Sequence, residues 1–141
     1  MAWKGALSMK KIEAFTRILL RTSGMRFTEE EEILMVGEEA QVSQYGIRYS
    51  RDGDERVLEE RVLCSPELVL ELLNRCQVLK WDGFWGAHPK GVRDGIMFSL
   101  KAEVNGGQVI SAEGSENFPR HYREFTDGLR AILRENGPEQ A

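Results

Sequence analysis

The segment from Ile96 to Val104 alternates strictly between apolar and polar side chains, and no other feature of the chain restricts its fold as much. A period of two predicts a β-strand that lays one face against a core. The apolar positions are Ile96, Phe98, Leu100, Ala102 and Val104. The Asn105-Gly106-Gly107 sequence that follows is typical of a turn, so a second strand is expected to return beside the first.

The register of this hairpin follows from which side chains would face each other. A three-residue loop sets Leu100 opposite Ala112, so that apolar residues meet across the strands. A two-residue loop would place Glu113 on the apolar face, because a slip of one residue turns a whole strand over. We therefore predict a three-residue loop in which Gly107 takes the left-handed bulge position.

Two segments have the 3.6-residue period of amphipathic helices. The first is expected to begin at Ser65-Pro66-Glu67, because serine caps a helix, proline suits its first position and glutamate complements its dipole. Its apolar stripe is Leu68, Leu72, Leu73, Cys76 and Leu79, broadened by Val69 and Leu70. The second is expected to run from Phe118-Pro119 to Asn136-Gly137-Pro138, and Gly128 would let it approach the sheet closely. Its stripe is Tyr122, Phe125, Leu129, Ile132 and Leu133.

The first half of the chain reads as strands. Residues 11–22 fit both a strand and a helical stripe, and their β-branched content and the following Ser23-Gly24 favour a strand. Further strands are expected at 33–36, 40–49 and 56–63. Asp52-Gly53 predicts a hairpin turn. The pattern predicts an α+β fold, an antiparallel sheet of five or six strands in the order ββββαββα with two helices packed on one face.

Length and composition fit one domain. The 141 residues are 41% hydrophobic and 30% charged, which is typical of a globular protein. We expect residues 1–8 to be a disordered leader, 9–137 a single α+β domain and 138–141 a frayed tail. The net charge of −4 argues against nucleic acid as a partner, because phosphates would be repelled. No apolar stretch has the length of a membrane span and no secretory signal is evident, so a cytoplasmic location is predicted.

Neither the cysteines nor the acidic run predicts a metal site, and no cofactor is expected. Cys64 and Cys76 lack CxxC spacing and have no neighbouring histidine, so we interpret both as reduced thiols. Glu29 to Glu32 are four consecutive carboxylates, and they cannot converge on one ion because neighbours point apart. The run is interpreted as a solvated, charge-guarded sheet edge. An alternative is that Glu29 to Glu39 form an acidic face through which an immunity-type or regulatory protein binds its partner.

The glycine- and tryptophan-rich segment 80–94 is the candidate functional region, because a long loop in a small domain is either functional or packed by its own side chains. With Gly114 to Asn117 it gives a candidate binding surface of Trp81, Asp82, Phe84, Trp85, His88, Asp94, Ser115, Asn117 and Tyr122. A structural role is the competing interpretation. Asp-Gly forms turns, the aromatic rings would join the helices to the sheet, and Ser115 or Asn117 would cap the last helix. Asp82, Asp94 and Asn117 would then bond free backbone amides.

An enzyme is the second functional hypothesis. Asp82 or Asp94 with His88 or His121 would form an acid–base pair if a carboxylate lay within about 3 Å of an imidazole in a cleft. The sequence contains no catalytic triad, phosphate loop or metal motif, so no catalytic residue is assigned.

Several short motifs between residues 78 and 133 form a pattern as a set. They are Trp81-Asp82-Gly83-Phe84, Asp94-Gly95 with Phe98, Val104-Asn105-Gly106, and Ala112 to Pro119 with Tyr122 and Phe125. The pattern resembles that of a family of small uncharacterised bacterial proteins. The resemblance implies a shared fold unit and a bacterial cytoplasmic setting, and it assigns no catalytic residue.

The function that these observations favour is a non-enzymatic binding or interaction module. Exposure of Trp85 or Phe84 beside a concavity would support it. A homodimer is a further expectation, because a sheet with one uncovered face that carries Tyr45 or Phe15 would favour a second copy.

Overall fold

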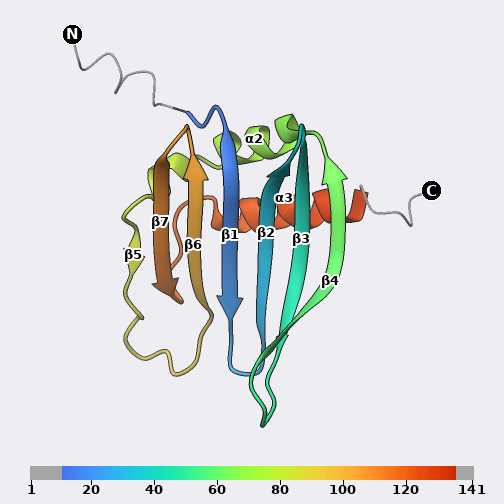
Figure 1. Cartoon of the computed structure of the whole chain (residues 1–141). Helices are drawn as coiled ribbons and strands as arrows, with labels where there is room; N and C mark the ends of the chain where they lie inside the picture. The colour runs from blue at the N-terminus through green and yellow to red at the C-terminus, as the bar shows by residue number, and fades with distance from the viewer. Residues whose placement is uncertain (1–10, 136–141) are drawn as a thin grey trace.

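The computed structural model describes residues 11–135, in which one seven-stranded sheet has both α-helices on the same face (Figure 1). The strands are β1 (Phe15–Ser23), β2 (Thr28–Val36), β3 (Glu39–Arg48), β4 (Glu55–Cys64), β5 (Trp85–Gly86), β6 (Met97–Val104) and β7 (Gln108–Ser115). The helices are α2 (Pro66–Arg75), the short 3-10 helix η1 (Val78–Trp81) and α3 (Tyr122–Glu135). The α+β class is confirmed. The expected leader, tail and helix end at Asn136-Gly137-Pro138 lie outside the described residues.

Strand β1 lies at the centre of the sheet, in the order β4-β3-β2-β1-β6-β7-β5. Every neighbouring pair is antiparallel except β5 and β7, which are parallel. The prediction of five or six strands was wrong because it missed β5, which has only two residues, Trp85 and Gly86. A strand of two residues shows no periodicity, so the sequence pattern could not reveal it.

The β6–β7 hairpin has the predicted register, with Leu100 opposite Ala112 and Val104 opposite Gln108. The loop therefore has three residues, 105–107. Its backbone differs in detail from the prediction. Asn105 (φ 50°) and Gly106 (φ 73°) take left-handed helical values, whereas Gly107 has a φ of 141°.

Strand β1 contains an irregularity that the period of two did not predict. Phe15 pairs with Val104 and Arg17 with Glu103, so Thr16 is an extra residue in the ladder. As a result Phe15 points to the core and is buried with Ile18 and Leu20. The expectation that Phe15 lies on the uncovered face was wrong for this reason.

The start of α2 is as predicted, since the Ser65 side chain accepts a hydrogen bond from the Glu67 amide and Pro66 opens the helix. Its buried stripe is centred on Val69, Leu72 and Leu73, and Leu68 is 44% exposed. The stripe is therefore rotated from the one predicted.

Helix α3 begins at Tyr122 and not at Phe118-Pro119, because His121 has a left-handed φ of 70°. It buries Phe125, Thr126, Leu129, Ile132 and Leu133. A Cβ at Gly128 would lie 2.4 Å from Leu72 Cδ1, so this glycine permits close packing on α2 and not, as expected, on the sheet.

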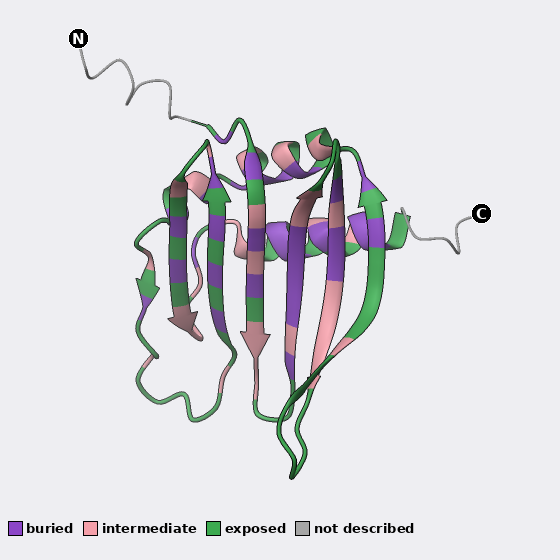
Figure 2. Ribbon diagram, viewed as in Figure 1, coloured by how far each residue is buried: buried purple, intermediate pink, exposed green. Residues whose placement is uncertain are grey.

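The two faces of the sheet differ in burial. Side chains on the helix side are buried along β6, where Phe98, Leu100, Ala102 and Val104 alternate with exposed residues (Figure 2). We call the opposite side the open face, because neither α2 nor α3 covers it (Figure 1). Within residues 11–135 no helix is long and apolar enough to cross a membrane.

Candidate functional site

Three members of the predicted binding surface belong to an aromatic cluster between α3 and the sheet. Trp81 is 3% exposed, and its Nε1 donates to the carbonyl of Arg120 at 3.0 Å. Its ring meets Phe125 edge-on at 5.5 Å and Tyr122 at 6.0 Å. Phe84 joins the same cluster through Phe98, at 6.2 Å between ring centroids. Trp81, Phe84 and Tyr122 thus join the helices to the sheet, as the structural interpretation predicted.

The polar members mainly fix the loop to the sheet. Asp82 Oδ1 accepts from the Ser111 amide at 2.9 Å, which confirms its expected role. Asn117 Nδ2 donates to the carbonyl of Ala87 at 3.2 Å, so it bonds a carbonyl and not an amide. Asp94 has no hydrogen-bond partner within residues 11–135, and Glu116 instead accepts from the Ile96 amide at 2.6 Å.

Neither Ser115 nor Asn117 caps a helix, because α3 begins several residues later at Tyr122. The Ser115 hydroxyl lies 2.7 Å from His88 Nδ1, while His88 Nε2 faces the carbonyl of Val92. A nitrogen that faces a carbonyl must carry a proton, so in the neutral imidazole Nδ1 accepts from the serine hydroxyl. The histidine therefore holds the loop against the end of β7.

The predicted acid–base pairs are not joined by hydrogen bonds in the described part of the chain. His88 bonds Ser115, and His121 Nδ1 lies 3.2 Å from Glu124 Oε1. Neither Asp82 nor Asp94 contacts an imidazole in the described part of the chain.

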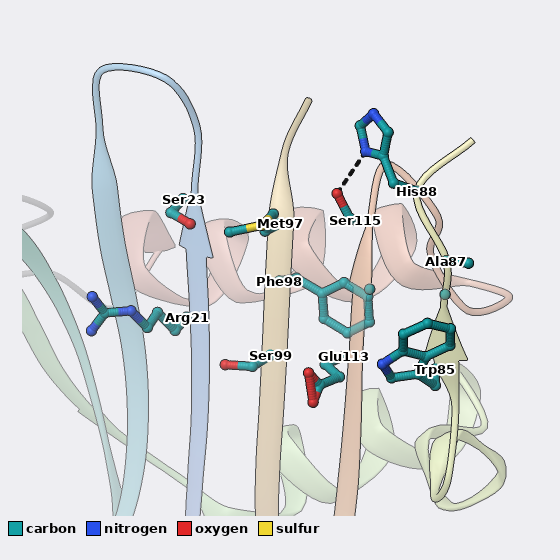
Figure 3. Close-up of a pocket in the computed structure, with 12 residues that line it drawn as sticks. Arg21, Ser23, Trp85, Ala87, His88, Met97, Phe98, Ser99, Glu113 and Ser115 are labelled. Carbon is teal, nitrogen blue, oxygen red and sulfur yellow. Dashed lines mark hydrogen bonds between the residues drawn. The ribbon is translucent and has the colours of Figure 1, made fainter. Parts of the chain in front are cut away.

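Trp85 and the His88–Ser115 pair border a cavity of about 520 Å³ on the open face, which we call the open-face cavity. The Trp85 side chain belongs to β5 and is 71% exposed. Figure 3 shows the indole on the β5 side and Arg21 on β1, with β6 and β7 between them. Met97, 54% exposed, also lines the cavity. A large exposed ring beside a concavity is the feature that we expected of a binding module.

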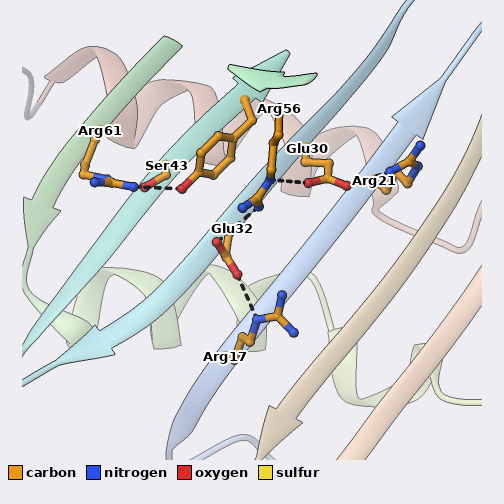
Figure 4. Close-up of polar contacts among 8 residues, drawn as sticks. Arg17, Arg21, Glu30, Glu32, Ser43, Arg56 and Arg61 are labelled. Atoms are coloured by element: carbon orange, nitrogen blue, oxygen red, sulfur yellow. Dashed lines mark hydrogen bonds and ion pairs between the residues drawn. The ribbon is translucent and has the colours of Figure 1, made fainter. Parts of the chain in front are cut away.

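A chain of ion pairs crosses the open face from β1 to β4 (Figure 4). Arg17 Nε lies 2.8 Å from Glu32, and Arg21 Nη1 lies 2.8 Å from Glu30. Arg56 joins the two carboxylates, with Nε 2.7 Å from Glu30 and Nη2 3.2 Å from Glu32. Both glutamate side chains are 9% exposed, whereas these arginines are 38–46% exposed.

Two further side chains extend this network. Arg61 Nη2 donates to the hydroxyl of Tyr45 at 2.8 Å, and Arg61 Nε donates to Ser43 at 2.8 Å. The guanidinium carbon of Arg56 lies 3.6 Å above the Tyr45 ring, which is a cation–π contact. Tyr45 is thus on the open face, as expected, but two arginines contact it.

The interpretation of Glu29 to Glu32 as a solvated sheet edge was wrong. Strand β2 lies between β1 and β3, and Glu30, Glu31 and Glu32 are all buried. Neighbouring side chains point to opposite faces, as predicted. The surface over β2 therefore presents arginines. Of the glutamates in the proposed acidic face from Glu29 to Glu39, only Glu38 and Glu39 are exposed, and the role of this face in binding a partner stays a prediction.

Glu31 points to the helix side, where sequence analysis placed no functional residue. Its side chain is 3% exposed, and Oε2 has no hydrogen-bond partner in the described part of the chain. Burial, reinforced by the charge of Glu29, raises its pKa to about 7, although Arg130 opposes the rise. The parity of β2 could have indicated this residue, since Glu31 is two positions from the buried Ile33 and shares its face.

Glu31 borders a second cavity of about 730 Å³, which we call the helix-side cavity. Thr22 from β1 and Tyr122, Thr126 and Arg130 from α3 also line it. Burial raises the pKa of Tyr122, so its hydroxyl, 3.5 Å from the hydroxyl of Thr22, stays neutral at physiological pH. Of the predicted surface, only Tyr122 borders this cavity.

No protein-family model matches the chain, and no curated protein shows significant similarity to it. The resemblance to a family of small bacterial proteins therefore stays a prediction. Within residues 11–135 no three His, Cys, Asp or Glu side chains are grouped to hold a metal ion. Cys64 and Cys76 are buried and unpaired with each other.

The ion-pair network predicts a specific loss of stability when Arg56 is replaced by methionine. Glu30 and Glu32 would each lose one of two guanidinium partners, at a cost of about 2 kcal/mol given that Arg56 is partly exposed. Burial alone would raise the pKa of Glu32, but the hydrogen bonds and charges of Arg17 and Arg56 outweigh it and lower the pKa. The stabilisation is therefore present above the ordinary glutamate pKa and is lost as the pH falls through the lowered one.

Urea unfolding at neutral and acidic pH measures this effect, with Arg61→Met as the matched control. Among the described residues, Arg61 bonds only uncharged groups, Ser43 and Tyr45. We expect Arg56→Met to cost more than Arg61→Met at neutral pH, and the difference to shrink in acid. Equal costs at both pH values would show that the ion pairs contribute nothing.

The buried carboxyl group of Glu31 predicts a gain in stability for Glu31→Gln. The folded-state pKa of about 7 lies above the ordinary value of 4.5. As the pH rises from 4.5 to 7, the free energy of unfolding of the wild type therefore decreases. The full loss is about 3 kcal/mol, at about 1.4 kcal/mol for each pH unit. Glutamine cannot ionise, so the variant is expected to be more stable than wild type above pH 7 and similar to it near pH 5.

Chemical denaturation across this pH range checks the prediction. Glu113→Gln is the control, because Glu113 is an exposed residue of β7 on the open face. A Glu31→Gln variant with the same pH dependence as wild type would contradict the assignment.

Proposed function

We propose that this protein is a non-enzymatic binding module that binds an acidic protein segment on the open face of its sheet. The observation that carries the proposal is the indole of Trp85, which is 71% exposed beside the open-face cavity. Exposed tryptophan is costly in water and is enriched at the centres of protein interfaces. Its neighbour in the same segment, Trp81, is 3% exposed, so the packing of the segment does not require both rings.

Charge on the open face supports an acidic partner. Over β1 to β4, Arg17, Arg21 and Arg56 pair with the carboxylates of Glu30 and Glu32 (Figure 4). Arg61 lies on the same face and bonds the uncharged Ser43 and Tyr45. Four positive groups against two negative ones leave a local excess of positive charge on a protein whose net charge is −4. Half-exposed arginines bind carboxylates in bidentate geometry, which favours Asp and Glu side chains on the partner.

Arg21 connects the charged and apolar parts of this surface. It pairs with Glu30 through Nη1 and also borders the open-face cavity. A guanidinium has five N–H donors, so the ion pair leaves others for a ligand. A segment that places an apolar side chain against Trp85 and Met97 would bring an adjacent acidic residue toward Arg21.

This proposal is tested with a random dodecapeptide library displayed on phage and selected on the purified protein. We expect enriched peptides to combine acidic residues with a large apolar residue. Trp85→Ala and Arg21→Ala are each expected to lower the affinity for a selected peptide by about tenfold or more, as hot-spot truncations do. Fluorescence anisotropy of a synthesised peptide measures the affinity.

Leu68→Ala is the matched control, because Leu68 is an exposed apolar residue of α2 and lies away from the open face. It is expected to leave peptide affinity unchanged. Selection of basic peptides would contradict the acidic partner. Peptides bound equally by Trp85→Ala and wild type would contradict the use of the open face.

A further inference from the structure

The helix-side cavity contains a buried carboxyl group whose Oε2 atom has no partner in the described part of the chain, that of Glu31. Buried polar atoms are nearly always hydrogen-bonded, so an unpaired one beside a cavity calls for an explanation. The side chain is 3% exposed, which places its charge away from bulk water. Glu31 lines the cavity, so a bound molecule with hydrogen-bond donors would find an acceptor in this carboxyl group.

The other acidic groups that line this cavity have partners of their own. Glu116 accepts from the Ile96 amide at 2.6 Å, and Glu124 lies 3.1 Å from Arg75. Asp127 lies 3.6 Å from Arg130, which reduces the positive charge that Arg130 offers to Glu31. Glu31 is therefore the acidic group of the cavity that a ligand would neutralise.

The lining also indicates the body of the ligand. Ile96, Phe118, Pro119 and the ring of Tyr122 give the cavity an apolar wall. Phe118 and Tyr122 are stacked with ring centroids 4.7 Å apart, and their faces attract cations as well as apolar groups. A volume of about 730 Å³ is in the range of sites for small organic molecules.

We infer that the helix-side cavity binds a small organic cation, a primary ammonium on an aromatic or aliphatic body, whose ammonium group bonds the carboxylate of Glu31. The inference is independent of the open-face proposal, because Glu31 lines a cavity with residues of α3, on the opposite face of the sheet. The neighbouring Glu29, which raises the pKa of Glu31, adds negative potential toward a cation. Arg123 and Arg130 oppose it, so a ligand with a carboxylate is the competing class.

The probes are phenethylamine, phenethyl alcohol and phenylpropionate, which share one aromatic body and differ in charge. Each is titrated into the full chain above pH 7, where Glu31 is ionised, and binding is followed by changes in amide NMR signals. We expect phenethylamine to bind at least about tenfold more tightly than the alcohol, as a charge-assisted bond implies. Signals of β2 and α3 are expected to shift.

Glu31→Gln keeps the size of the side chain and removes its charge. It is expected to lower the affinity for phenethylamine by about tenfold and to leave the affinity for the alcohol unchanged. Glu113→Gln, on the open face, is expected to bind like wild type. Absence of phenethylamine binding at millimolar concentration, equal binding by Glu31→Gln, or tighter binding of phenylpropionate would each overturn the inference. Shifts confined to β5 and β7 would do the same, because they would place the amine in the open-face cavity.

Discussion

The pleat of β2 sends consecutive carboxylates to opposite faces of a sheet that has helices on one side only. Glu30 and Glu32 point to the open face, and Glu31 points toward α3. Because β2 is an inner strand, neither face leaves these groups freely hydrated. Each carboxylate must therefore pair with a positively charged group or become protonated. The carboxylates on the open face do the first, and the one on the helix side tends toward the second.

On the open face the partners are arginines. Long side chains from β1 and β4 reach across the sheet, so that Arg17, Arg21 and Arg56 cover Glu30 and Glu32 with their stems and neutralise them with their heads. The result is a surface that is polar and positive where the sequence is most acidic. On the same face, beyond β6 and β7, β5 presents an exposed indole at the edge of the sheet.

On the helix side, no arginine within residues 11–135 forms an ion pair with Glu31. The aromatic residues at the start of α3 fill the space beside β6, and the cavity forms where this cluster ends. Arg130 is close enough to lower the pKa of Glu31 but pairs with Asp127 at 3.6 Å. The fold thus leaves one carboxyl group poised between its two protonation states at neutral pH.

The sequence predicted correctly those elements that depend on interactions between residues close together in the chain. The start of α2 at Ser65 and the β6–β7 register depend on a cap and on apolar pairing that the sequence displays. The position of a strand in the sheet is not local, so Glu29 to Glu32 were wrongly interpreted as an edge. In the candidate site, the sequence around Trp81 and Trp85 does not show which of the two is buried. Trp81 is buried because it belongs to η1, and Trp85 is exposed because it belongs to the edge strand β5.

Two adjacent residues of β2, Glu31 and Glu32, ionise differently because they face different sides of the sheet. NMR titration of the side-chain carboxyl carbons of Glu31 and Glu32 in the folded protein tests this difference most directly. We predict a pKa of about 7 for Glu31 and a pKa below the ordinary glutamate value of 4.5 for Glu32. Two carboxyl groups that titrate together near the ordinary value would contradict the account.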